Sequence, residues 1–336
     1  MGTKKRMCLT ITLSFLLISL PWNELKAAPY YQGKILKMIC GHEPGGGYDR
    51  IARVVAKHLP KYIPGNPVIL VSNMPGASTM IAANYVYNVA KPDGLTVGIY
   101  DRALPFAQLF KVEGVKFDLT QYSWVASLAS ESMILATRTD LPYKTLDDLR
   151  KTTEPIYVAA TGPAASAYQF PALAKAYLGI NIQFVIYPSS AAQILAIEKK
   201  EVSGRGGSYS SLKAYIERGL VLPVLRSRVV EPGIEKVPVD EELTDNKLAK
   251  TVMAMRTASD EIGRPFVAPP KTPVEVMNIL RAGFAKVAQD PELQAEIDKL
   301  RMKVEYTSAE ECVKKISYIL NQPEETVKEF GKYVKF

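Results

Sequence analysis

Cysteine and histidine are scarce in this chain of 336 residues, which contains three cysteines and two histidines. So few cysteines exclude a small scaffold held together by disulfides, and we expect Cys40 and Cys312 to be buried thiols. Neither His42 nor His58 has a second histidine or a cysteine pair at the spacing that metal sites use. We therefore expect the protein to bind no metal and no cofactor.

Long apolar runs are absent except at the N-terminus. After residue 27 no apolar stretch reaches 18 residues, which excludes a protein with several membrane spans. At the N-terminus, three basic residues, 4–6, precede an apolar segment over residues 7–22, and the small residues Ala27 and Ala28 follow it. This order is typical of a signal peptide over residues 1–27, so we expect export and cleavage after Ala27. An uncleaved anchor helix is the alternative.

Charge of one sign is not concentrated anywhere in the sequence. Removal of residues 1–27 takes away four basic residues and one acidic residue, which lowers the formal net charge from +8 to +5. The longest local cluster of charges, residues 198–201, contains both signs. Because nucleic-acid binding needs a basic patch or stripe, we expect no nucleic-acid partner. A mildly positive protein of this kind is compatible with small anionic ligands.

Sequence motifs of the common hydrolases are missing as well. The chain has no Gly-x-Ser-x-Gly nucleophile elbow, and a catalytic triad would need one of its two histidines. The adjacent carboxylates at 147–148 and at 310–311 begin predicted helices, where they complement the helix dipole. We therefore expect that the protein is not an enzyme. The alternative is an exported α/β hydrolase or isomerase, which would need titratable groups such as His42, Glu43 and Asp49 in its cleft.

Strand and helix patterns alternate along the chain. Short apolar runs with the character of strands are followed by segments whose apolar residues recur at helical spacing. In the first half the predicted strands are 35–40, 68–71 and 96–100, and the predicted helices are 48–62 and 80–89. A second cycle has predicted strands at 156–160, 182–187 and 221–225 and helices at 168–178 and 189–198. These cycles and a helical C-terminal third predict an α/β fold with parallel sheets covered by helices on both faces.

A glycine-rich loop, Pro44-Gly45-Gly46-Gly47-Tyr48-Asp49, lies between the first predicted strand and the first predicted helix. Unpaired backbone N–H groups and the positive end of a helix dipole favour an anion there, and glycines let a ligand come close to the backbone. The spacing fits neither a dinucleotide fingerprint nor a P-loop. Asp49 would repel an anion unless it turns aside to cap the helix or accepts a hydrogen bond from a ligand or water. A plain tight turn is the alternative.

Two further loops follow the next two predicted strands. Residues 73–79 form a second turn before a helix, and Asp101 and Arg102 lie after the third strand. Because ligands of open parallel sheets bind beyond the carboxyl ends of the strands, we expect the three loops to line one cleft. Arg102 could bind a carboxylate there through two hydrogen bonds, or form a surface ion pair with a neighbouring acid.

The order of these motifs resembles a known family. The segments 44–53 (PGGGYDRIAR), 64–67 (PGNP), 73–77 (NMPGA), 82–85 (AANY) and 91–94 (KPDG) together resemble the extracytoplasmic solute receptors of tripartite tricarboxylate transporters, also called Bug receptors. Segments 160–166, 187–190, 264–270 and 290–292 extend the resemblance over nearly all of the chain after the signal peptide. His42-Glu43 stands where many members have an apolar or aromatic residue, and Ser78 stands where glycine is usual.

The resemblance implies a type II periplasmic-binding-protein architecture, a Venus flytrap of two Rossmann-like lobes between which the chain crosses twice. Domain one would comprise residues 28–138 plus 257–336, and domain two residues 139–256. The function implied is a periplasmic receptor that captures a small organic carboxylate and delivers it to the large and small membrane permease subunits of a tripartite tricarboxylate-type secondary transporter. We expect a monomer. The alternative among binding proteins is a sensor subunit that presents its ligand to a membrane signalling kinase.

The resemblance also assigns residues to the ligand. In the family, backbone amides of the domain-one loops hold a carboxylate, and the second domain closes over it. The matching positions here are Gly46, Gly47, Tyr48, Asp49, Gly76, Ala77 and Ser78 in domain one and Thr161, Ser166, Ser189 and Ser190 in domain two. Arg102 and Arg205, at loop positions that resemble a subgroup of the family, are either carboxylate clamps or surface arginines. The identity of the carboxylate is left open.

Overall fold

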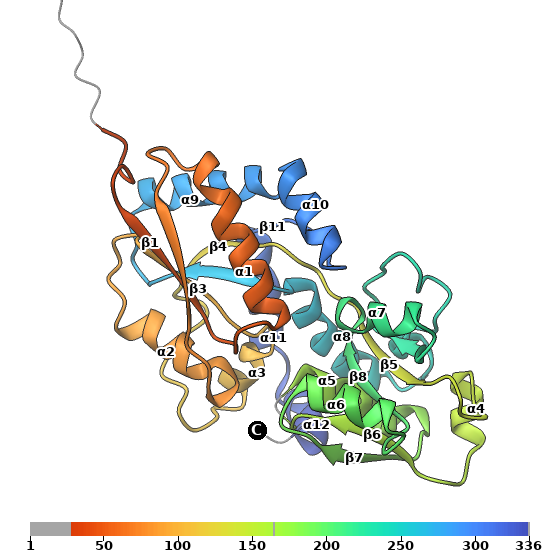
Figure 1. Cartoon of the computed structure of the whole chain (residues 1–336). Helices are drawn as coiled ribbons and strands as arrows, with labels where there is room; N and C mark the ends of the chain where they lie inside the picture. The colour runs from red at the N-terminus through yellow and green to blue at the C-terminus, as the bar shows by residue number, and fades with distance from the viewer. Residues whose placement is uncertain (1–27, 164, 335–336) are drawn as a thin grey trace, which may run out of the picture.

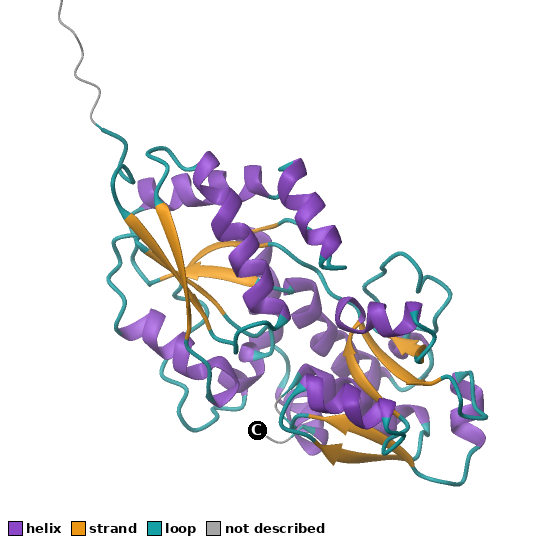
Figure 2. Ribbon diagram, in the orientation of Figure 1, coloured by secondary structure: helices purple, strands orange, loops and turns teal. Residues whose placement is uncertain are grey.

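The computed structural model describes residues 28–163 and 165–334, so the expected signal peptide, residues 1–27, lies outside the described residues. The described chain forms two separate β-sheets, and Figure 1 and Figure 2 show each sheet in its own lobe with helices packed on it. No helix in the described ranges combines the length and the apolar character that a membrane span requires.

The first sheet has six strands and contains both early and late parts of the chain. Its order is β11 (Thr307–Ser308), β4 (Ser123–Ser127), β10 (Pro265–Ala268), β3 (Thr96–Ile99), β1 (Ile35–Cys40) and β2 (Val68–Asn73). The helices of this lobe are α1 (Gly47–His58), α2 (Met80–Asn88), α3 (Leu104–Leu109), α9 (Val274–Val287), α10 (Pro291–Lys299) and α11 (Ala309–Leu320). Strand β1 therefore has the predicted bounds, and it lies inside the sheet because its apolar run is buried between β2 and β3.

The second sheet has five strands from the middle of the chain. Its order is β7 (Ile182–Ile186), β6 (Ile156–Ala160), β8 (Gly204–Ser208), β5 (Met133–Arg138) and β9 (Val221–Arg226). The helices here are α4 (Leu146–Lys151), α5 (Ser166–Leu178), α6 (Ser190–Glu198) and α7 (Tyr209–Glu217), followed by α8 (Lys247–Ile262). Arg205 lies in strand β8, so its expected position in a loop is wrong.

The expectation of parallel sheets is right for part of each sheet and wrong for the rest. Strand β1 pairs in parallel with β2 and β3, and β6 pairs in parallel with β7 and β8. Strands β10 and β5, each the first strand after the chain has crossed from the other lobe, pair antiparallel with both of their neighbours. Counted from the β2 or β7 edge, each sheet thus has three parallel strands followed by a reversed fourth strand. In the first sheet the short edge strand β11 also pairs antiparallel, with β4.

The chain passes from the first sheet to the second through residues 128–132, and it re-enters the first sheet through residues 263–264, which join α8 to β10; α8 itself contacts both α11 and α5. Strand β5, which the expected boundary at residue 138 leaves in domain one, pairs within the second sheet, and helix α8 spans the expected boundary at residue 256. The last helix, α12 (Glu324–Tyr333), contacts α5 and α8. The hydroxyl of Tyr177 on α5 donates a hydrogen bond of 2.9 Å to Glu329 on α12, so helix α12 contacts the second lobe. The domain limits stay a prediction.

Three chemically sensitive side chains, those of two cysteines and one histidine, are buried. Cys40 and Cys312 are free, buried thiols, as predicted, and they belong to two different apolar cores. His58 lies on the buried face of α1, with its Nε2 atom 2.9 Å from a carboxylate oxygen of Glu296 on α10. The histidine therefore serves to join two helices of the first lobe.

Candidate ligand-binding cavity

A cavity of about 600 Å³ lies between the two lobes. Residues from the ends of β1, β2 and β3 line one side of it, and residues from β8 and the starts of α5, α6 and α7 line the other. A cavity of this size is suited to a small organic molecule. The three loops of the first lobe thus meet at one cleft, as the sequence predicts.

Most of the residues that the sequence assigns to a ligand are together in this cavity. Those that line it are Gly46, Gly47, Tyr48, Gly76, Ala77, Ser78, Arg102, Thr161, Ser166, Ser190 and Arg205. Asp49 and Ser189 do not line it. Ser189 is the N-cap of α6, where its hydroxyl accepts a hydrogen bond from the amide of Ala192. Contact of any of the thirteen with a ligand stays a prediction.

The carboxylate of Asp49 is turned away from the cavity. It accepts hydrogen bonds from the amide of Gly45 at 2.8 Å, from the side-chain amide of Asn73 at 2.8 Å and from the guanidinium of Arg53 at 3.0 Å. Its side chain is 3% exposed, yet these bonds hold the pKa of Asp49 below its usual value against the opposing effect of burial. Asp49 therefore fixes the glycine-rich loop, and its negative charge is compensated before any anion approaches.

The second loop has an unusual backbone. After Gly76, the residues Ala77, Ser78 and Thr79 all have φ between 45° and 72°, the left-handed region that L-residues rarely adopt. The hydroxyl of Thr79 accepts a hydrogen bond of 3.1 Å from the amide of Asp101, which ties this loop to the third loop. A run of strained residues at a cavity wall is typical of a functional loop.

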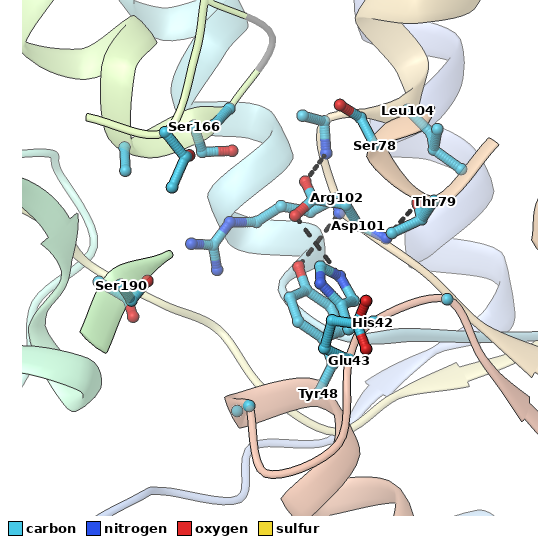
Figure 3. A pocket seen from close by; sticks show the side chains of 18 of the residues that line it. His42, Glu43, Tyr48, Ser78, Thr79, Asp101, Arg102, Leu104, Ser166 and Ser190 are labelled. Carbon is cyan, nitrogen blue, oxygen red and sulfur yellow. Dashed lines mark hydrogen bonds and ion pairs between the residues drawn. The ribbon is translucent and has the colours of Figure 1, made fainter. Parts of the chain in front are cut away.

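An aromatic stack forms the wall between the first and third loops (Figure 3). The rings of His42 and Tyr48 are stacked with their centroids 4.0 Å apart, and His42 Nε2 lies 3.7 Å from Asp101. Burial lowers the pKa of His42, and the neighbouring Arg264 and Arg102 add to that effect, whereas Asp101 opposes it. The Tyr48 hydroxyl accepts a hydrogen bond from the amide of Arg102.

Arg102 points into the cavity but already has an acidic partner. Its Nε atom lies 3.3 Å from a carboxylate oxygen of Asp260 on α8, and its side chain is 8% exposed. Asp260 is fully buried and also makes two hydrogen bonds to Arg256, at 2.6 and 2.9 Å. The alternative of a surface arginine is therefore wrong for Arg102, and any charge it offers to a ligand is shared with Asp260.

Arg264 is a cavity residue that the sequence analysis missed. It follows Gly263 at the second crossing, it is 4% exposed, and its Nη2 atom lies 2.5 Å from a carboxylate oxygen of Glu131. Its Nε and Nη1 atoms are buried without a hydrogen-bond partner among the described residues. Such unsatisfied N–H groups are costly unless a ligand or water meets them.

Arg205 enters the cavity from the second lobe and is 4% exposed, so it is not a surface arginine either. Its Nε donates to the carbonyl of Gly206 at 2.9 Å, and its Nη1 donates to the carbonyl of Ser190 at 3.4 Å. Burial lowers the pKa of Arg205 to about 10. A cation with only neutral partners is thus fixed in the second wall of the cavity.

Sequence reasoning missed several other lining residues, among them Arg50, Met133 and the hydroxyls of Ser208, Ser210 and Ser211. Arg50 directly follows Asp49 within the segment that carries the family resemblance, so the sequence could have indicated that it lines the cavity. The three serines follow strand β8, whose glycine-rich sequence has no strand pattern. No local signal in the sequence marks them.

Two α/β lobes joined by two crossings, with a ligand-sized cavity lined from both, define a two-lobed solute-binding protein. The chain belongs to the family described as the tripartite tricarboxylate transporter family receptor, TctC, whose model matches residues 51–332. The predicted family and fold class are thereby confirmed, and both are those of substrate-binding receptors.

Individual relatives agree with this assignment. A UPF0065 protein of Bordetella pertussis is 26% identical over 274 residues, which cover 79% of each chain. The solved structure of the periplasmic binding protein BugD has a TM-score of 0.70 at 20% identity and covers 90% of this chain and 98% of its own. MatC of Rhodopseudomonas palustris with bound malate has a TM-score of 0.68 at 17% identity, covering 88% of this chain and 99% of its own.

Proposed function

We propose that this protein is a periplasmic receptor that binds a small organic carboxylate between its lobes and delivers it to the membrane subunits of a tripartite secondary transporter. The observation that carries the proposal is the pair of buried, unpartnered N–H groups of Arg264 beside the glycine-rich loop. Either N–H group can donate a hydrogen bond to a carboxylate, and a carboxylate is also compatible with the amide groups at the start of α1. Among the described residues, Glu131 reaches Nη2 of this guanidinium, and Nε and Nη1 have no acceptor.

The chemistry of the cavity supports this function better than catalysis. Cationic and hydroxyl side chains make up most of its polar lining, whereas Glu43 and Asp101 are its only carboxylates among the described residues. His42 is held against Tyr48 by stacking. A receptor needs only a ligand that interacts more favourably with the closed form than with the open form, so no reaction is required.

Related structures support a carboxylate as the ligand but do not identify which carboxylate it is. MatC is described with bound malate, and a second R. palustris protein, with a TM-score of 0.69 at 18% identity, is described with adipate. These two diacids differ in length and in hydroxylation. We propose that the two lobes divide at the crossings 128–132 and 263–264, so that closure about these segments traps the ligand.

A thermal-shift panel on the protein without residues 1–27 tests the proposal. Mono-, di- and tricarboxylates, aromatic acids and acidic amino acids would be compared with sugars and neutral amino acids. A ligand at 100 times its Kd adds about 2.7 kcal/mol to the free energy of unfolding. At roughly 2 to 4 °C per kcal/mol, the melting temperature should rise by several degrees for at least one acid. A response to sugars or neutral amino acids but to no acid would refute it.

A further inference from the structure

Helix α3 presents apolar side chains to the cavity. Leu104 and Ala107 lie one turn apart on this helix and therefore on the same face, and both are among the lining residues. Each is more than nine-tenths buried. Figure 3 shows Leu104 on the opposite side of the Arg102 side chain from Glu43 and Tyr48. The cavity thus has an apolar side that lies away from the glycine-rich loop.

The C-terminal end of α3 directs a third apolar side chain to this side. The amide of Lys111 donates a hydrogen bond of 3.1 Å to the carbonyl of Gln108. The amide of Val112 donates one of 3.0 Å to the carbonyl of Ala107, and Lys111 has a left-handed backbone with φ of 51°. This combination is a Schellman motif, in which the residue after the left-handed one packs against the last turn of the helix. Val112 is therefore held next to Ala107, and it too lines the cavity.

The second lobe completes this apolar side with Met133 on β5 and Ala167 on α5. The sulfur atom of Met133 accepts a hydrogen bond of 3.2 Å from Nη2 of Arg102, and α5 packs against β5. We call this part of the cavity the α3 recess, and we define it by six lining residues, Met80, Leu104, Ala107, Val112, Met133 and Ala167. All six belong to, or pack against, one apolar core that contains residues of both lobes.

The charged residues that precede α3 are already paired within the protein. Arg102 is paired with Asp260. The carboxylate of Asp101 accepts a hydrogen bond of 2.8 Å from the amide of Ala103 and lies 3.7 Å from His42. None of the six side chains of the α3 recess carries an oxygen or a nitrogen atom. A polar group of a ligand would therefore lose its hydrogen bonds to water there without replacement, whereas an apolar group would be stabilised by leaving water.

We propose that the α3 recess receives an apolar body of the ligand, so that the receptor selects carboxylates with a hydrocarbon chain or ring over carboxylates with the same carbon skeleton and several hydroxyl groups. This inference rests on the proposed function, which places the carboxylate at the glycine-rich loop and Arg264. The carboxylate group is then bound at the polar side of the cavity, and the recess determines which carboxylates are retained.

An apolar body would also link the two lobes. Leu104, Ala107 and Val112 contact it from the first lobe, and Met133 and Ala167 contact it from the second lobe. Closure of the cleft then removes apolar surface of the ligand and of both lobes from water, so the ligand favours the closed form. A hydroxylated body lacks that contribution, because its hydroxyl groups would be buried without hydrogen-bond partners.

Matched ligand pairs test the inference on the unchanged protein. Calorimetry on the protein without residues 1–27 would compare hexanoate with gluconate, adipate with galactarate, and cyclohexanecarboxylate with quinate. The two acids of each pair share their carboxylate groups and their carbon skeleton and differ in hydroxyl groups. For the pair whose shape fits the cavity, we expect the hydrocarbon acid to bind at least about 10-fold more tightly than the hydroxylated acid.

A variant of nearly unchanged shape connects this preference to the α3 recess. Val112→Thr replaces a methyl group by a hydroxyl group, and the ratio of the two affinities should fall by about 3- to 10-fold. Val115→Thr is the matched control and should keep the wild-type ratio. Val115 lies three residues further along and is also partly buried, but among the described residues it is not part of the cavity lining. Melting temperatures of both ligand-free variants check that the fold is intact.

The outcomes separate this inference from the proposed function. If the hydroxylated acids bind as tightly as their hydrocarbon counterparts, carboxylate binding stands and the role of the α3 recess is overturned. An unchanged ratio in Val112→Thr overturns that role as well, as does a best ligand whose whole body is hydroxylated. Hexanamide, which keeps the chain of hexanoate without its charge, tests the other end of the ligand. If hexanamide binds as tightly as hexanoate, or if neutral solutes bind and no acid does, the proposed function itself fails.

Discussion

The guanidinium of Arg264 lies 2.5 Å from a carboxylate oxygen of Glu131, and the two residues belong to the two segments that cross between the lobes. The other carboxylate oxygen of Glu131 accepts a hydrogen bond of 2.7 Å from the hydroxyl of Ser210 on α7. One buried chain of interactions therefore connects the cavity, both crossings and the second lobe. Since a Cβ atom at Gly263 would clash with the carbonyl of Ala129, the two crossings also touch through their backbones.

Glu131→Gln should destabilise the protein by about 3 kcal/mol, because it leaves the buried Arg264 without its counter-ion. Urea unfolding of the ligand-free protein measures this change. The double variant Glu131→Gln, Arg264→Met is the control, and it should recover part of the loss because it removes the orphaned charge. If the free energy of unfolding of Glu131→Gln lies within about 1 kcal/mol of the wild-type value, the ion pair of Glu131 and Arg264 does not hold the crossings together.

Gly46→Val should weaken carboxylate binding at least 10-fold and leave the fold intact. The backbone at Gly46 has φ of −72°, and a Cβ atom there would meet only the carbonyl of Glu43, at 3.5 Å, so a side chain fits at this position of the cavity lining. Gly46→Ala provides a graded control with a smaller effect. Calorimetry and the melting temperature together check the prediction. Wild-type affinity in Gly46→Val would mean that the ligand does not approach this backbone.

The sequence predicted the regular elements well where an apolar run ends in turn residues. Strands β1 and β6 have the predicted bounds, and the loop ends of β1, β2 and β3 meet at the cavity because a parallel sheet brings its carboxyl ends together. Strand β8 could not be predicted in this way. Its glycines are needed for close packing against Ala136 and Ala167, whereas glycines in a sequence usually indicate a turn.

The loops that line the cavity could be predicted from the sequence, but its ion pairs could not. Gly46 and Gly76 lie in short sequence motifs that favour turns. The neighbouring residues alone are therefore enough to predict that both glycines lie in loops. The partners of Arg102 and Arg264 lie 158 and 133 positions away along the chain, at Asp260 and Glu131. Such pairs depend on how the chain returns through the crossings, which the local pattern of residues does not encode.

Glu231→Gln should flatten the pH dependence of stability between about pH 4.5 and pH 7. Burial, and then repulsion by Glu131, raises the pKa of Glu231 from 4.5 to about 7. In this window the unfolded chain binds fewer protons than the folded one, so the free energy of unfolding of the wild type falls as pH rises. Glutamine keeps an oxygen that can accept the 2.8 Å hydrogen bond from the amide of Ser132 but cannot ionise.

Between pH 4.5 and pH 7.5 the free energy of unfolding of the wild type should therefore fall by about 2 to 3 kcal/mol more than that of Glu231→Gln. Urea unfolding at several pH values measures the difference. Asp240, whose pKa burial also raises to about 7, titrates in both proteins and cancels in the comparison. Glu198→Gln, at an exposed ion pair, is the control and should follow the wild type. Parallel curves for wild type and Glu231→Gln would contradict the prediction.

Thiol labelling should find two free cysteines in the denatured protein without residues 1–27 and none in the native protein. Cys40 lies in the core beneath α1, and Cys312 lies in the core around α8 and α11, so the two sulfur atoms are in separate apolar environments. Burial raises the pKa of Cys40 to about 11 and that of Cys312 to about 12, which suppresses the reactive thiolate. Labelling in denaturant without reductant, read by mass, distinguishes the alternatives. No label would mean a disulfide, and a third label on protein isolated from the periplasm would mean that Cys8 and the N-terminal segment had been retained.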